Sequence, residues 1–129
     1  MPLHRETIHA PGAPDAVGAY SHAVRAGDLL FCSGQVALDP SSNELVGDTP
    51  AEQARQCLEN LQAVCEAAGT SLDRAVRCGV FLTDLAGAWA EVNEVYASFF
   101  PADPPARAAI GVAALPKGAQ VEVDAIVAL

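Results

Sequence analysis

The chain has 129 residues, of which 51% are hydrophobic, and it carries a net charge of −9. This size and apolar content predict one folded domain, residues 1–129, and they exclude a disordered chain. The excess of 16 acidic over seven basic residues disfavours nucleic acid as a partner, and no apolar run is long enough to span a membrane. The first residues lack a signal-peptide pattern, so we expect a soluble, cytoplasmic protein.

The first third of the chain predicts short strands. Residues 3–9 form one candidate strand, and residues 21–38 predict two strands joined at Gly27-Asp28, a strong hairpin signal.

A helix should follow over residues 50–68. Thr49 caps it, Pro50 takes its first position and Glu52 completes a capping box, while Gly69 ends it. Its apolar residues recur at helical spacing and predict the buried stripe Ala54, Leu58, Leu61, Cys65 and Ala68.

The last part of the chain predicts a strand, a second helix and two more strands. Residues 75–84 alternate, which places one set of side chains on a single face: Val76, Cys78, Val80 and Leu82. Residues 87–100 predict a helix that Pro101 stops, with a buried stripe of Trp89, Val92, Tyr96 and Phe99. Residues 106–115 and 120–129 read as strands, and the short turn between them lets them pair as a hairpin.

This order of elements predicts an α+β or α/β sandwich, with two helices on one face of one mixed sheet. The strands carry apolar residues on both faces, and two helices can cover only one of them. We therefore expect an oligomer that covers the other face.

Common cofactor and metal signatures are missing from the sequence. There is no G-x-G-x-x-G or P-loop motif, and the one lysine, Lys117, lies in a turn. Neither the three histidines nor the four cysteines have the spacing of a zinc site, so the cysteines read as buried, reduced side chains. We expect no cofactor and no metal.

Arg107 is the most informative polar residue. Strand alternation puts it on one face with small side chains only, namely Ala109, Gly111 and Ala113, and leaves room for a carboxylate that could bind the guanidinium. Glu122 and Asp124 are the nearby acids if the last two strands pair. Taken alone, the pattern also fits a solvated strand end or a purely structural pair of Arg107 with Glu122.

Five stretches resemble the RidA (YjgF) family in the same order along the chain. The C-terminal stretch PARAAIGVAALPKGAQVEVDAI is the longest match; the others are GAYSHAV, FCSGQ, TPAEQARQCLENLQAVCEAAG and WAEVNEVYASFF. The resemblance implies a fold like that of bacterial chorismate mutase and a homotrimer with sites in clefts between subunits. It implies hydrolysis of enamines and imines such as 2-aminoacrylate, released by PLP-dependent dehydratases, to 2-keto acids and ammonia.

The resemblance also implies roles for individual residues. Arg107 matches the clamp for the substrate carboxylate, and Glu122 matches the acid that places or activates water. The other matched positions of the cleft are the polar side chains Tyr20, Ser33 and Asn93 and the backbone positions Gly34 and Ala109.

Three positions depart from the family pattern. Ala19 stands where many members have proline, His22 replaces a glutamine, and Ala109 replaces a cysteine found in some members. The last change excludes a nucleophilic thiol there but not attack by water.

Two alternative functions stay open: a non-catalytic module that binds small carboxylates in the same cleft, and a ribonuclease or translation inhibitor, which the acidic balance disfavours.

Overall fold

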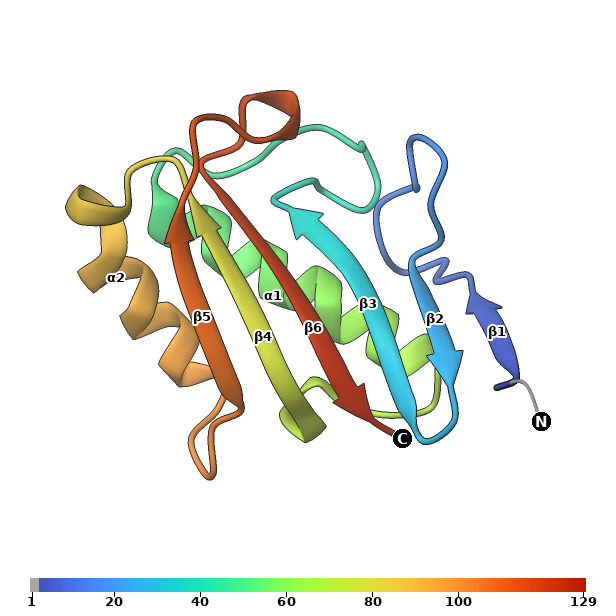
Figure 1. The fold of residues 1–129 in the computed structure, drawn as a ribbon. Coiled ribbons are helices and arrows are strands. Elements are labelled where there is room, and N and C mark those ends of the chain that lie inside the picture. The colour runs from blue at the N-terminus through green and yellow to red at the C-terminus, as the bar shows by residue number, and fades with distance from the viewer. Residues whose placement is uncertain (1–2) are drawn as a thin grey trace.

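The computed structural model describes residues 3–129 and contains one six-stranded mixed sheet with two helices on one side (Figure 1). The strands are β1 Arg5–Ile8, β2 Ala23–Ala26, β3 Leu29–Val36, β4 Ala75–Leu82, β5 Ala106–Gly111 and β6 Val121–Ala128. The helices are α1 Pro50–Ala67 and α2 Leu85–Ser98, and short 3₁₀ turns cover Leu72–Arg74 and Pro116–Gly118. Within this part of the chain, no helix has the length and apolarity that a membrane crossing requires.

The sheet has the strand order β1-β2-β3-β6-β4-β5. All neighbouring strands are antiparallel except β4 and β5, which run parallel because α2 crosses over between them. The predicted hairpin at Gly27-Asp28 is confirmed by the pairing of β2 with β3. The predicted hairpin of the last two strands is wrong, because β4 lies between β5 and β6 and the turn before β6 carries the chain across it.

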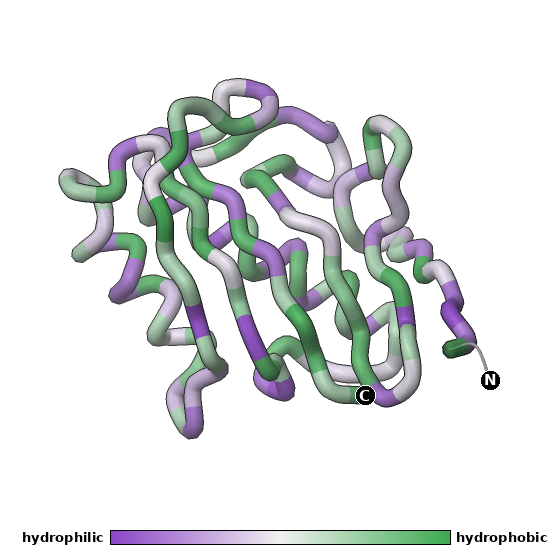
Figure 2. Tube along the Cα trace, viewed as in Figure 1, coloured by the Kyte–Doolittle hydropathy of each residue, from purple (hydrophilic) through white to green (hydrophobic). Residues whose placement is uncertain are grey.

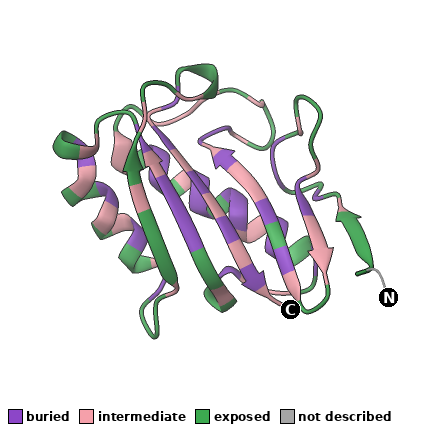
Figure 3. Ribbon diagram, viewed as in Figure 1, coloured by how far each residue is buried: buried purple, intermediate pink, exposed green. Residues whose placement is uncertain are grey.

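The helix α1 begins as predicted. The Oγ1 of Thr49 accepts a hydrogen bond from the backbone N–H of Glu52 at 3.2 Å, while the Glu52 carboxylate accepts from the backbone of Asp48 at 2.8 Å rather than from Thr49 itself. All five residues of the predicted stripe are buried against the sheet. Figure 2 shows apolar and polar positions alternating along β6, and Figure 3 shows buried positions on β3, β6, β4 and α1.

Two predicted apolar stripes are only partly confirmed. In β4, Cys78, Val80 and Leu82 are buried, but a register shift between Ala75 and Arg77 turns Val76 outward, where it is 49% exposed. In α2, which begins at its Asp84 cap, Val92 and Tyr96 are buried, whereas Trp89 and Phe99 are only partly buried.

The second face of the sheet carries no helix. Its strands expose Phe31 by 43% and Ile110 by 48% on that side, which we call the open face. Apolar side chains of this size on a sheet face are typical of a surface that another molecule covers. All four cysteines are buried and free, as expected.

Candidate active site

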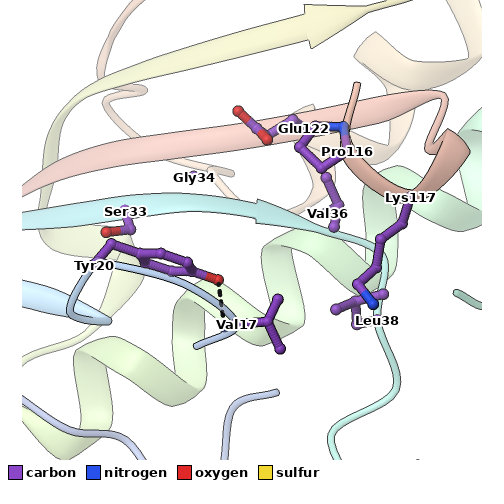
Figure 4. A pocket seen from close by; sticks show the side chains of 9 residues that line it. All are labelled: Val17, Tyr20, Ser33, Gly34, Val36, Leu38, Pro116, Lys117 and Glu122. Atoms are coloured by element: carbon purple, nitrogen blue, oxygen red, sulfur yellow. Dashed lines mark hydrogen bonds between the residues drawn. The ribbon is translucent and has the colours of Figure 1, made fainter. Parts of the chain in front are cut away.

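A pocket of about 320 Å³ lies where β3 ends and β6 begins, and we call it the acid pocket (Figure 4). Four of the predicted site residues lie together in it: Tyr20, Ser33, Gly34 and Glu122. Its remaining lining was not predicted and consists of Val17, Val36, Leu38, Pro116 and Lys117. The pocket therefore joins one carboxyl group, two hydroxyl groups and the ammonium group of Lys117 to an apolar wall.

A β-bulge shapes the floor of the acid pocket. Cys32 pairs with Ala125 and Gln35 with Val123, so that Ser33 and Gly34 together face one residue of β6. The Ser33 hydroxyl donates to the carbonyl oxygen of Ser21 at 2.6 Å, which fixes the strand to the loop before β2.

Gly34 makes room for the Glu122 carboxyl. A Cβ atom at position 34 would lie 2.7 Å from Oε2 of Glu122, closer than side chains approach in proteins. Only glycine at this position lets the carboxyl lie directly over the strand.

The environment of Glu122 changes its acidity. Burial raises the pKa of the Glu122 carboxyl above its ordinary value, and the nearby charge of Asp124 raises this pKa further. Asp124 itself accepts a hydrogen bond from the backbone of Gly79 at 2.8 Å and lies 4.0 Å from Arg77. Glu122 has no such partner among residues 3–129, so it is the carboxyl of this pair that is free to exchange a proton.

Tyr20 forms the opposite side of the pocket. Its hydroxyl oxygen accepts a hydrogen bond from the backbone N–H of Val17 at 3.3 Å, which leaves the hydroxyl hydrogen free to donate to a ligand. The ring is 45% exposed, so it can contact a molecule that enters the pocket.

Arg107 lies in a second pocket of about 350 Å³, the arginine pocket. Its Nη1 donates to Oδ1 of Asn93 at 2.7 Å, and its guanidinium carbon lies 4.7 Å from the ring centroid of Trp89 and 4.8 Å from that of Tyr96. These three partners come from one face of α2, since helical residues three and four apart are neighbours. The lining of this pocket comprises Arg107, Asn93, Tyr96, Ala97, Phe100, Pro104 and Pro105, whereas Trp89 is not part of it.

The partners of Arg107 hold it without neutralising its charge. In the described chain the only ion pairs within 4.0 Å join Arg25 to Glu6 and Arg77 to Asp124. An amide and two aromatic rings fix the orientation of the guanidinium through a hydrogen bond and cation–π contacts. Its positive charge therefore remains available to an anionic ligand.

Sequence reasoning missed the aromatic partners of Arg107. Trp89 and Tyr96 read as packing residues because they belong to an apolar helical stripe, and both rings in fact contact the guanidinium. Ala109 shares the helix side of β5 with Arg107 but lines a separate, shallow hollow with Leu85, Ala86 and Trp89. The helical spacing of Trp89 and Tyr96 from Asn93 was the sequence signal that could have identified them as partners of Arg107.

The structure does not bring Arg107 and Glu122 together within one chain. Arg107 faces α2 from the edge strand β5, whereas Glu122 faces the open side of the sheet from β6, and β4 runs between these strands. We expected Arg107 and Glu122 to lie close together on the paired strands of a hairpin, and this prediction is wrong. Nor do residues 3–129 contain a cluster of three or more side chains that could hold a metal ion.

Comparisons with known proteins identify relatives of this chain. A family model described as Endoribonuclease L-PSP matches residues 10–129. The chain is 52% identical over 124 residues to the RutC family protein y4sK of Sinorhizobium fredii, across 96% of this chain and 98% of that protein. It is 44% identical over 122 residues to the 2-iminobutanoate/2-iminopropanoate deaminase of Rattus norvegicus, across 95% and 88% of the two chains. The crystal structure of RidA from an Antarctic Psychrobacter species matches with a TM-score of 0.91 at 46% identity, across 96% and 99%.

Proposed function

This chain belongs to the RidA (YjgF) family, and from the geometry of its two pockets we propose that it hydrolyses 2-imino acids and their enamine tautomers. The reaction joins one imine and one water to give a 2-keto acid and ammonia, the chemistry that the name of the rat relative describes. We propose 2-aminoacrylate and small 2-imino acids as substrates.

The observation that carries this proposal is the state of Arg107. Its guanidinium is held by Asn93, Trp89 and Tyr96 and has no carboxylate within 4.0 Å in the described chain. A guanidinium binds a carboxylate through two parallel hydrogen bonds, and a 2-imino acid carries a carboxylate beside its reacting carbon. Arg107 would thus bind the substrate and orient the C=N bond at the same time.

Glu122 supplies the proton transfers in this proposal. As a carboxylate it takes a proton from water while the water oxygen bonds to the imine carbon and the C=N electron pair moves to nitrogen. It then returns this proton to the nitrogen, which gives a carbinolamine with an NH2 group. Glu122 next takes the proton of the new hydroxyl group as the C=O bond forms, and it delivers this proton to the nitrogen, which leaves as ammonia when the C–N bond breaks. Burial raises the pKa of Glu122 toward neutral pH, which suits a group that both accepts and returns a proton. Tyr20 and Ser33 hold the water or the substrate by hydrogen bonds.

The two pockets have to meet between subunits for this mechanism to work. We propose a homotrimer of chorismate-mutase-like subunits, in which the β5 edge of one subunit packs on the open face of the next. Such a head-to-tail contact repeats around a threefold axis and creates equivalent sites. It would cover Phe31 and Ile110, which are exposed by 43% and 48% in the single chain. Gly34 and Ala109 would line the cleft through their backbones.

No cofactor enters this mechanism, since water is the nucleophile and the polar residues supply the protons. PLP-dependent dehydratases release enamines of this class, so enzymes of this kind are the proposed metabolic source of the substrate, in the cytoplasm. The charge of −9 disfavours the alternative of RNA cleavage.

A competition assay tests the proposal. An amino-acid oxidase generates a 2-imino acid, semicarbazide traps it, and the trapped product is followed with and without this protein. We expect the wild type to divert imine to keto acid, and Arg107→Ala to lose this activity while keeping its oligomeric state. If neither protein diverts any of several imines but the wild type binds 2-keto acids, the chain is a non-catalytic carboxylate-binding module.

A further inference from the structure

His22 is a buried histidine that holds the loop carrying Tyr20. It is 2% exposed and immediately precedes β2. Its Nδ1 accepts a hydrogen bond from the backbone N–H of Ala10 at 2.9 Å, and its Nε2 donates to the carbonyl oxygen of Pro14 at 2.7 Å. Its own carbonyl oxygen accepts from the backbone N–H of Ser33 at 3.0 Å. One residue thus connects two points of the loop to the bulge in the pocket floor.

The loop that His22 holds forms one wall of the acid pocket. Val17 and Tyr20 both line this pocket, and neither lies in a helix or strand. The second side-chain anchor of the loop is at the surface, where Asp15 and Asn43 exchange hydrogen bonds of 2.8 and 3.1 Å. A third anchor is the Ser33 hydroxyl, which donates to the carbonyl oxygen of Ser21 at 2.6 Å. The position of the Tyr20 hydroxyl therefore depends on the buried anchor at His22, on this bond and on the exposed anchor.

The two hydrogen bonds of the His22 ring fix its tautomer. The backbone N–H of Ala10 is a donor, so Nδ1 must be an acceptor; the carbonyl of Pro14 is an acceptor, so Nε2 must carry the hydrogen. Both bonds exist together only in the neutral imidazole. Protonation at Nδ1 sets a donor against the donor of Ala10 and breaks that bond.

The surroundings of His22 give its protonated form no compensation. Among residues 3–129, no carboxylate lies within 4.0 Å of its ring nitrogens, and the carboxylate of Asp15 accepts from Asn43 instead. The titratable group facing the ring is His9, whose ring centroid lies 5.3 Å away and which could add only positive charge. The strand β3 contributes the uncharged Ser33, and α1 meets the loop through Ala63.

We propose that His22 is a positioning residue for the acid pocket and that its protonation releases the Tyr20 loop, so that this pocket is intact only while His22 is neutral. The effect on turnover rests on the proposed deaminase function, whereas release of the loop does not.

Glutamine is the matched replacement for this histidine. Its side-chain amide offers one acceptor and one donor, as the neutral ring does, but it does not titrate. His22→Gln should therefore keep the loop in place and remove its pH dependence. His9→Gln removes the neighbouring imidazole and leaves both bonds of His22 unchanged.

The first test measures the loop directly in the full-length protein. Amide exchange by NMR gives the protection factor of the Ala10 backbone N–H at about pH 5 and about pH 7.5, a range that spans imidazole titration. In the wild type and in His9→Gln we expect protection to fall at least about fivefold at the lower pH, the effect of losing one buried hydrogen bond, and in His22→Gln to stay constant. Constant protection in the wild type, or an equal fall in His22→Gln, would overturn the proposal.

The second test measures the consequence for catalysis. In the wild type, kcat/KM should fall with two protonations as the pH is lowered, from Glu122 and His22, so each further pH unit costs about 100-fold rather than about tenfold. His22→Gln should show the shallower slope. Asn43→Gly, which keeps a residue suited to the φ of 58° there and removes the exposed anchor, should lower kcat/KM by the same factor at every pH. Parallel pH profiles for the wild type and His22→Gln would contradict the proposed effect of His22 on catalysis. A lack of turnover in both proteins would contradict the proposed deaminase function. In that case the amide-exchange result still tests whether protonation of His22 releases the loop.

Discussion

Replacing Gly34 with alanine places a methyl group in the space that the Glu122 carboxyl occupies. A Cβ atom at position 34 lies 2.7 Å from Oε2 and 2.9 Å from Cδ of Glu122. Because the carboxyl is the end of a flexible side chain, we expect it to rotate away while the backbone stays in place. A displacement of about 1 Å at a reacting group lowers rates by about 100-fold, so kcat/KM should fall by roughly that factor.

The assay for Gly34→Ala combines imine hydrolysis with thermal unfolding. Gly12→Ala is the matched control, because its Cβ meets only Ala63 at 3.8 Å and neither glycine has a positive φ. Both variants should change the free energy of unfolding by less than about 1 kcal/mol, as surface and side-chain adjustments do. A Gly34→Ala protein that assembles normally and keeps the wild-type kcat/KM would refute the idea that the carboxyl works from its position over Gly34.

Three further variants test other parts of the account. Glu122→Gln should abolish turnover. It should also raise Tm relative to the wild type at pH values above the folded-state pKa of Glu122, but not below the ordinary value of 4.5. Folding raises this pKa, so the protonated carboxyl stabilises the wild type below the unfolded-state pKa, and this contribution is lost as the pH rises through the folded-state pKa. Trp89→Leu should raise KM about 3- to 30-fold with a smaller change in kcat, the range expected from one lost cation–π contact, whereas Phe99→Leu, whose ring faces Arg55, should not. Thr49→Ala should reduce the free energy of unfolding by about 1 kcal/mol in thermal denaturation without changing kcat/KM, because it removes only the cap of α1.

Local signals in the sequence were sufficient for the elements that local chemistry determines. Thr49 and Pro50 identify the start of α1, and Gly27 takes the positive φ that the predicted hairpin turn requires. In each case the residues that determine the structure are neighbours in the chain. The burial of all four cysteines follows equally directly from their apolar surroundings.

Features that depend on strand order could not be predicted in this way. The turn before β6 looks like a hairpin turn, but β6 enters the sheet between β3 and β4, because the parallel crossover through α2 sends β5 to the edge. The bulge at Ser33-Gly34 follows from the pairing of β3 with β6, and the sequence did not predict this pairing. The role of His22 in the loop likewise depends on contacts with residues that precede it by 8 and 12 positions.

The central claim of the account is that Arg107 of one subunit works with Glu122 of another, and a subunit-complementation experiment tests it most directly. Arg107→Ala and Glu122→Gln proteins, each inactive alone, are co-expressed with different tags, and mixed oligomers are purified for the imine assay. A site between neighbouring subunits is intact when the Glu122→Gln subunit supplies its arginine and the Arg107→Ala subunit supplies its glutamate. Every mixed trimer has one such site, so about a third of the sites in the purified mixed oligomers are intact. We predict roughly that fraction of wild-type activity. Mixed oligomers that stay as inactive as either parent would contradict the account.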